Sequence, residues 1–182
     1  MSSVSRDFER GIVGARLERV SYFVTTPDLA WVVRPNLERA DLGCDLVFTA
    51  GVIGVTWELH CRGLEIRSSS IGGAFLDDQP IDVTSDSPNW RQCVGQRVEA
   101  ITVTRAAELN PGGQTTTTDV LMLRFPSMAV AIAPAQYLDE LGELVHNSDE
   151  LSIAFGPTVA DALAVLRLES LDGEGGAATP SA

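Results

Sequence analysis

Apolar and polar residues alternate along much of the chain, and one stretch of this alternation occurs twice. Residues 14–22 read Gly-Ala-Arg-Leu-Glu-Arg-Val-Ser-Tyr, and residues 95–103 read Gly-Gln-Arg-Val-Glu-Ala-Ile-Thr-Val. Gly, Arg and Glu match in register, and in both copies the apolar phase shifts after the Glu. An inserted residue turns every later side chain of a strand to the other face. The pattern therefore predicts two copies of one β unit, with bulges at 18–19 and 99–100.

The first unit extends over residues 12–67. A long strand is predicted over 12–25, followed by a loop marked by Pro27 and by Arg-Pro-Asn at 34–36. Residues 44–49 and 52–59 are rich in β-branched and aromatic side chains, and Ala-Gly at 50–51 separates them, which indicates a hairpin. A short strand at 64–66 completes the unit.

The second unit extends over residues 94–156 and repeats this order. The strand after Gly95 leads to an Asn-Pro-Gly-Gly turn at 110–113, and the strand at 119–125 corresponds to the one that begins at 44. A further strand is predicted at 128–132 and a short helix at 135–145. Leu-Ser-Ile at 151–153 then corresponds to Leu-Glu-Ile at 64–66.

The remaining segments define the domain organisation. Residues 1–11 form an N-terminal arm, and residues 68–93, rich in Ser, Gly, Asp and Pro, connect the two units. Val159, Leu163 and Leu166 recur at helical spacing, so a C-terminal helix is predicted over 157–169, before a disordered tail over 170–182.

A single unit of this kind leaves one apolar face open, and the second copy is its natural cover. We therefore predict one compact, mainly β domain of two pseudo-symmetric antiparallel β units with a C-terminal helix. The pattern is compatible with both a sandwich and a barrel.

The charge of the chain is strongly acidic. Its 182 residues include 25 acidic residues against 13 basic ones, which are all Arg, and the formal net charge is −12. Between residues 137 and 174 the only basic residue is Arg167. This charge would repel nucleic acid and anionic membranes and would attract a basic protein. The N-terminus lacks a signal-peptide pattern, no apolar run is long enough to span a bilayer, and the three cysteines lack paired spacing, so a cytoplasmic location is expected.

Residues with metal-binding or catalytic chemistry do not form a recognisable motif. His60 and Cys61 are adjacent, so on a strand they point to opposite faces, and Cys44, Cys93 and His146 show no ligand spacing. The glycine-rich stretches lack the Lys-Ser/Thr of a phosphate-binding loop, and no Gly-x-Ser-x-Gly sequence occurs. We therefore expect no metal, no cofactor and no catalytic residue.

Two kinds of side chain have a structural interpretation. Arg16 with Glu18, and Arg97 with Glu99, lie two residues apart in the repeated strand, so the repeat predicts a cross-strand ion pair in each unit. Trp57 is expected in the core. Trp90 fits the core and a binding surface equally well, since Trp is common in both.

Several segments together resemble a group of uncharacterised bacterial proteins from GC-rich genomes. The resemblance rests on residues 41–48, 55–57 (Val-Thr-Trp), 63–66, 82–84, 89–98 (a Trp-x-x-x-Val-Gly-x-x-Val pattern) and 149–155. Proteins of this look are similar to the immunity proteins of polymorphic toxin systems, which neutralise a toxin by binding it. Here Glu-Leu follows Trp57, where the similar proteins carry Asp-Pro, so the role of that turn does not transfer.

The acidic charge and this resemblance predict a non-enzymatic protein-binding module, similar to an immunity protein, that covers a basic toxin domain. The predicted contact residues are acids of the connector and of the 139–150 segment, with an aromatic anchor: Asp77, Asp78, Asp82, Asp86, Trp90, Tyr137, Asp139, Glu140, Glu143, Asp149 and Glu150. One alternative is a small-molecule enzyme or carrier, such as a cyclase or isomerase, that uses a barrel interior. A second alternative is a structural subunit of an assembly.

Overall fold

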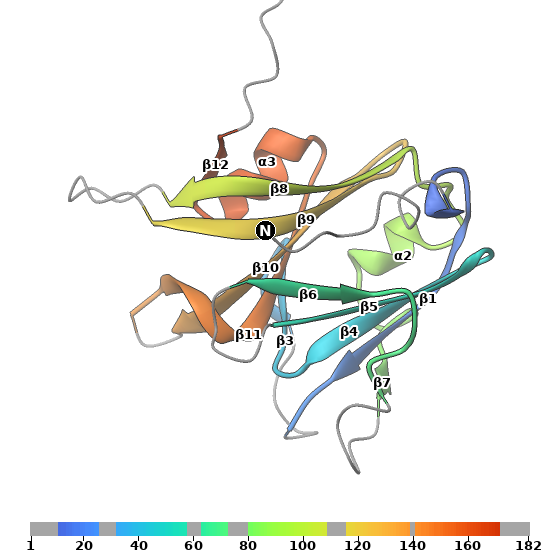
Figure 1. Ribbon diagram of the computed structural model, residues 1–182, viewed down its shortest axis with the longest axis horizontal. Helices are drawn as coiled ribbons and strands as arrows, with labels where there is room; N and C mark the ends of the chain where they lie inside the picture. The colour runs from blue at the N-terminus through green and yellow to red at the C-terminus, as the bar shows by residue number, and fades with distance from the viewer. Residues whose placement is uncertain are drawn as a thin grey trace, which may run out of the picture.

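Two antiparallel sheets face each other in the computed structural model, which describes residues 11–25, 32–57, 63–72, 80–108, 116–138 and 141–171 (Figure 1). The strand order is β6-β5-β4-β1-β7 in the five-stranded sheet and β12-β8-β9-β10-β11-β3-β2 in the seven-stranded sheet. One of the two sheets curves as a half-barrel. The predicted class, a mainly β protein of two antiparallel units with a C-terminal helix, is confirmed.

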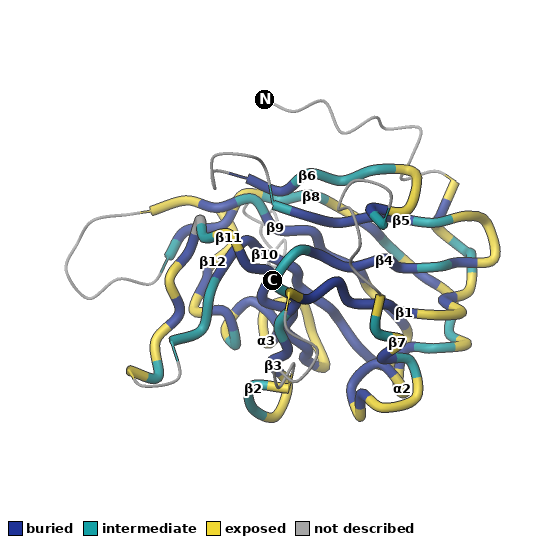
Figure 2. The backbone as a smooth tube through the Cα atoms, turned by 90° about the horizontal axis from the view of Figure 1, so that it is seen from below, coloured by how far each residue is buried: buried dark blue, intermediate teal, exposed yellow. Residues whose placement is uncertain are grey.

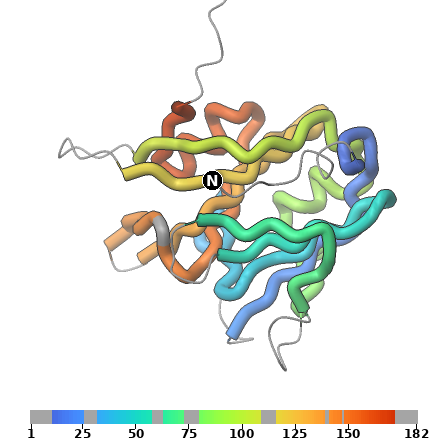
Figure 3. The backbone as a smooth tube through the Cα atoms, in the orientation of Figure 1, coloured from blue at the N-terminus to red at the C-terminus, as the bar shows by residue number. Residues whose placement is uncertain are grey.

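Each unit contributes four strands that are neighbours in one sheet in chain order, with the β2–β3 hairpin inserted between the first two strands of the first unit; their course can be followed by colour in Figure 3. The first unit supplies β1 (Leu17–Phe23), β4 (Gly43–Phe48), β5 (Gly51–Trp57) and β6 (Leu64–Arg67); the second supplies β8 (Ala100–Glu108), β9 (Thr117–Arg124), β10 (Ala129–Leu138) and β11 (Glu143–Gly156). The register also repeats. Val20 pairs with Leu46 in the first unit, and Ile101 pairs with Leu123 in the second.

Both predicted bulges are present. The pairing of β1 with β4 shifts between Leu17 and Arg19. In the second unit the N–H of Glu99 donates to the carbonyl of Arg124 over 2.8 Å, and Arg124 is also the partner of Ala100. Two residues therefore lie opposite one, which defines a bulge.

The two units meet at an antiparallel bridge between Arg16 and Arg97. Gly14 and Gly95, which precede these arginines, both have positive φ, +87° and +82°. The backbone hydrogen bonds around the bridge are reciprocal: Gly14 N–H to Val98 O, Gly95 N–H to Leu17 O, Leu17 N–H to Gln96 O and Val98 N–H to Ala15 O. Each bond has its counterpart with the two units exchanged, so a pseudo-twofold axis passes through this bridge.

The two arginine side chains extend this reciprocity and correct the prediction of an Arg–Glu ion pair in each unit. Arg16 donates to the carbonyl of Gly95 over 2.6 Å, and Arg97 donates to the carbonyl of Gly14 over 2.8 Å. Glu99 instead pairs with Arg124, at 3.2 Å. The guanidinium groups therefore join the two units to each other.

The segment predicted as a loop after β1 contains a hairpin. β2 (Val32–Arg34) and β3 (Leu37–Ala40) are joined by a tight turn at Asn36, whose φ is +64°. β3 pairs with β11. This hairpin of the first unit therefore belongs to the sheet of the second, a long-range pairing that local pattern does not reveal.

The predicted helix over 135–145 is wrong. β10 and β11 form a hairpin through this segment, with Ala135 opposite His146 and Leu138 opposite Glu143. The turn of this hairpin lies within the segment, where the N–H groups of Leu141 and Gly142 donate to the carbonyl of Leu138 and Gly142 has φ of +65°. Strand pairing on both sides of the turn thus overrides the helix propensity of the segment.

The C-terminal helix α3 (Val159–Val165) is shorter than predicted. The Thr158 side chain caps it by accepting from the N–H of Asp161, and Arg167, with φ of +57°, reverses the chain. β12 (Leu168–Ser170) then pairs with β8 at 106–108, so the predicted tail begins after a strand. Residues 1–10 and 172–182 lie outside the described residues. No helix in the described ranges is long and apolar enough to cross a membrane.

The buried side chains form two clusters, and Figure 2 shows the buried segments of the chain in dark blue. Side chains from both sheets fill the space between them, among them Leu46 and Ile53 from the first and Leu123 and Ile153 from the second. A second cluster lies between the outer face of the seven-stranded sheet and α3, with Met122 and Leu163 among its members. The two sheets therefore pack face to face over a shared apolar core.

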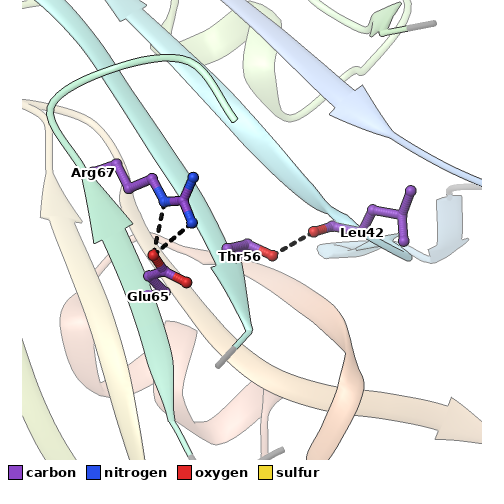
Figure 4. A network of polar contacts seen from close by, with 4 residues as sticks. All are labelled: Leu42, Thr56, Glu65 and Arg67. Atoms are coloured by element: carbon purple, nitrogen blue, oxygen red, sulfur yellow. Dashed lines mark hydrogen bonds and ion pairs between the residues drawn. The ribbon is translucent and has the colours of Figure 1, made fainter. Parts of the chain in front are cut away.

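The outer face of the first sheet is covered by a loop in place of a helix. Asp45 on β4 accepts from Ser70 Oγ and from the N–H of Ile71, and the Ile71 side chain is fully buried. Figure 4 shows two polar contacts nearby. Thr56 donates to the carbonyl of Leu42 over 2.6 Å, and on the edge strand β6 Arg67 pairs with Glu65 at 2.7 Å.

Candidate functional site

An apolar groove lies on the outer face of the seven-stranded sheet. α3 contacts β10, β11 and β12, and part of β8 and β9 beside it remains open to solvent. The groove has a volume of about 730 Å³. Aliphatic side chains make up most of its lining, chiefly Met122, Val159, Leu163 and Leu168. A groove of this size and lining is able to hold an apolar side chain or a small molecule.

Charged side chains stand at the margin of this groove. Arg124 and Glu169 are among the residues that line it. Arg124 is engaged by Glu99, whereas Glu169 is an exposed residue of β12. A ligand with apolar groups and a positive charge would match this combination.

A second polar feature is a carboxylate network in the core. Glu38 on β3 is fully buried, and three side chains donate to it: Tyr22 Oη at 2.6 Å, Ser87 Oγ at 2.6 Å and Asn89 Nδ2 at 2.9 Å. Trp90 Nε1 in turn donates to Tyr22 Oη at 2.6 Å. The network joins β1, β3 and the connector.

Burial dominates the electrostatics of this network. It raises the pKa of Glu38, although the hydrogen bonds from Ser87, Tyr22 and Asn89 partly oppose the change. Burial and the adjacent Glu38 carboxylate also hold the pKa of Tyr22 well above its ordinary value, so Tyr22 remains a donor. Because no side chain of the network reaches solvent beyond a few per cent exposure, we assign it a structural role.

The thiols and the histidine do not form a reactive cluster. Cys44 and Cys93 are free and buried, and burial raises the pKa of Cys93 to about 12. Burial lowers the pKa of His146, an effect that the nearby Glu108 carboxylate opposes. Within the described ranges, no three His, Cys, Asp or Glu side chains are grouped as a metal site requires. His60 and Cys61 lie outside these ranges.

The predicted acidic contact residues are dispersed. Asp82 and Asp86 are exposed beside β7 (Ile81–Asp82), and Glu143 and Asp149 are exposed on β11. Figure 1 shows the β10–β11 hairpin at the left of the molecule and β7 at the lower right, well apart from it. Glu150 is buried, with 8% exposed. Asp77, Asp78, Asp139 and Glu140 lie outside the described residues.

The two predicted aromatic anchors differ in exposure. Trp90, in the short helix α2 (Trp90–Cys93), is fully buried and meets Phe155 edge-to-face at 5.0 Å, so it is a core residue and cannot serve as a surface anchor in this conformation. Tyr137 is half-buried, with the Arg34 guanidinium 5.3 Å from its ring centre. Trp57 is half-buried against the core, as expected, and donates to the carbonyl of Asp41.

Sequence reasoning missed the residues of the groove and of the Glu38 network. The apolar stripe of α3 indicates a packing face, and Leu163 does pack on the sheet. Its exposed neighbours Ala160 and Ala164 line the groove. The repeat itself carried a signal for the groove. β1 and β8 are equivalent strands, but β7 of the connector pairs with β1, whereas β12 after the C-terminal helix pairs with β8.

These features define a two-sheet β protein with a shared apolar core and an apolar groove open to solvent. Comparison with known proteins found no matching family model, no similar curated protein and no similar solved structure.

Proposed function

We propose that this protein is a non-enzymatic binding module for a basic protein, comparable to an immunity protein that neutralises a toxin by covering it. The observation that carries the proposal is the aliphatic groove of about 730 Å³ on a rigid two-sheet scaffold. Apolar contacts in such a groove supply affinity, and the net charge of −12 attracts the partner. The free, buried thiols of Cys44 and Cys93 suit a reducing compartment, so we place the complex in the cytoplasm.

The acids act on encounter more than on the bound complex. Exposed charges beside β7 and on β11 raise the rate of association through their summed field, and salt screens them over about 8 Å at physiological ionic strength. Dispersed acids therefore contribute to steering, even though they form no single patch.

The test is the association rate with a basic protein encoded next to the gene of this chain. Replacing Asp82, Asp86, Glu143 and Asp149 by their amides should lower the association rate constant about tenfold at low salt and change dissociation little. Arg19→Gln with Arg91→Gln, which makes the chain more acidic, is the control of opposite sign and should accelerate association. Rates that depend neither on salt nor on these substitutions would contradict the proposal.

The groove volume also supports a second candidate function, the binding of a small molecule. Sites for small molecules commonly have volumes of about 300–1,000 Å³. A thermal-shift screen of amphipathic compounds distinguishes the two candidates. A compound that raises the melting temperature of this chain, together with the lack of any protein partner, would favour the carrier.

A further inference from the structure

Because the two units are copies of one another, the pairing of a strand with β1 in the first unit shows how a strand could pair with β8 in the second. In the first unit β7 pairs with the outer edge of β1, opposite Ser21 and Tyr22. The next residue extends this contact, because the N–H of Val83 donates to the carbonyl of Val20 over 3.0 Å. The edge of β1 is thus closed by the connector of the chain itself.

The equivalent edge of β8 is open. Ile101, Thr102 and Val103 correspond to Val20, Ser21 and Tyr22, since they have the equivalent register partners on β9. β12 pairs with β8 further along, and the last contact on this side is from Leu171 N–H to the carbonyl of Arg105. No segment that the structure describes pairs with 101–103 on the side away from β9.

The exposure of the equivalent residues also differs between the two units. In the first unit Ser21 is 7% exposed and Tyr22 is fully buried. Their counterparts Thr102 and Val103 are exposed and half-buried. The second unit therefore lacks, among its described residues, the cover that β7 gives to the first.

The backbone of this stretch is oriented for pairing. Directions of the N–H and C=O groups alternate along a strand, and the carbonyl of Arg105 faces the open edge. The polar backbone groups of Val103 and Ile101, two and four residues earlier, face the same edge. This row of donors and acceptors matches an added strand.

The apolar groove lies beside this edge and includes Val103 in its lining. In the first unit the side chain of Val83, next to β7, is fully buried in the core between the sheets, so the neighbouring position of an added strand, equivalent to Asp82, is the one that faces the groove. The edge at β6 is different, because the Glu65–Arg67 pair places charges there (Figure 4). Charged side chains protect an edge from pairing, and the stretch 101–103 carries none.

We propose that β8 accepts, at Ile101–Val103, an extended segment of a basic protein by β-strand addition, with an apolar side chain of that segment in the groove. This inference rests on the proposed function and names its docking site. A basic partner is favoured over a second copy of this chain, because two molecules of charge −12 repel each other and Glu169 lies in the groove wall.

The first experiment uses the full chain and one synthetic peptide. The peptide carries the sequence of residues 80–85 with Leu in place of Asp82, whose position opposite Ser21 is on the groove side, and with Lys residues added at both ends. It therefore imitates β7 with an apolar side chain for the groove and with a positive charge. Amide hydrogen exchange of Ile101 and Val103 should be fast in the free chain and at least tenfold slower at saturating peptide. A peptide with Glu in place of every Lys should bind at least tenfold more weakly.

A groove variant tests the side-chain component. Ala160 and Ala164 are exposed helical residues that line the groove, so Ala160→Gln with Ala164→Gln fills it without disturbing the core. The peptide should bind this variant at least tenfold more weakly. Val145→Gln, at a 45% exposed position on β11 outside the groove lining, is the matched control and should leave binding unchanged.

The outcomes separate this inference from the proposed function. Slow exchange of Ile101 and Val103 in the free chain would mean that the chain's own residues or a second copy already cover the edge, and would overturn the inference. A basic partner that binds with salt-dependent association, but is indifferent to the groove variant and leaves both amides unprotected, would also overturn it and leave the proposed function standing. Peptide binding at this edge, without any basic protein partner, would support the strand site and remove the proposed function.

Discussion

Glu38 places a carboxylate in the core without a described cation beside it. Three neutral donors surround its two oxygens, from Tyr22, Ser87 and Asn89. Burying an ionised group is costly, and hydrogen bonds recover only part of that cost. The network holds β3 and the connector against β1 and so defines their arrangement. Because the ionised carboxylate is buried, we expect Glu38 to lower the free energy of unfolding.

This arrangement makes stability depend on pH. The folded protein has a pKa for Glu38 above the ordinary value of 4.5, so the unfolded chain loses this proton first as pH rises. The wild type should therefore lose stability relative to Glu38→Gln as pH increases from 4.5 through the folded pKa, by about 1.4 kcal/mol for each pH unit that separates the folded and unfolded pKa values. Urea unfolding of both proteins between about pH 4 and pH 8 measures this difference.

Removing one donor sharpens the test. The hydrogen bond from Ser87 lowers the pKa of Glu38, so Ser87→Ala should increase the loss of stability at high pH. A difference between the wild type and Glu38→Gln that stays constant over the whole pH range would contradict the assignment.

The sequence alone does not identify this residue. Glu38 lies in a strand of four residues, next to Arg39 and after a Pro-Asn turn, and such a segment has the composition of a loop. Its burial depends on pairing with β11, more than a hundred positions away in the chain. Local pattern carries no information on a contact at that separation.

At the scale of elements, β4 begins at a glycine that cannot carry a side chain. Gly43 has φ of +142°, and a Cβ there would overlap the carbonyl oxygen of Val55 and the side chain of Ile71. Gly51, at the start of β5, has a similar φ of +148° but open space around it. Substitutions at these two glycines therefore allow the cost of a strained backbone to be measured apart from the cost of steric overlap.

Gly51→Ala should cost about 1–3 kcal/mol through its unfavourable φ alone. Gly43→Ala should cost this amount and a further ~1–3 kcal/mol, because backbone atoms of β5 cannot move aside. Chemical denaturation of the two variants gives both values. Equal losses would show that the packing around Gly43 relaxes freely.

The elements differ in how far the sequence predicts them. The repeated strands, the β4–β5 hairpin and both bulges follow from alternation, which is a local property of a half-buried strand. β2, β3 and β12 are short, and β3 and β12 pair with strands distant in the chain. The segment 135–145, predicted as a helix, is the end of the β10–β11 hairpin, and local pattern does not reveal that pairing. The groove was not predicted because it depends on where α3 ends relative to β8.

At the scale of the molecule, the two units share one core. Leu46 and Leu123 occupy equivalent positions on β4 and β9, and both are fully buried between the sheets. Neither sheet can expose this surface and remain folded, so the units should unfold together.

Leu46→Ala and Leu123→Ala should each lower the free energy of unfolding by about 2–5 kcal/mol. Far-UV circular dichroism and tryptophan fluorescence should report a single coincident transition in both variants, although the described tryptophans, Trp57 and Trp90, lie in the first unit and the connector. Two separate transitions in Leu123→Ala, with the fluorescence change in the later one, would show that the units are independent.

The reciprocal bridge at Arg16 and Arg97 has the form of an isologous dimer interface within one polypeptide, since residue i contacts j as j contacts i. Such contacts are what the fusion of two duplicated, self-associating chains would leave behind. A homodimer of identical chains must have both edges closed or both open. A fused chain is free of that constraint, so one half can keep its edge sealed by its own connector while the other presents its edge to another molecule.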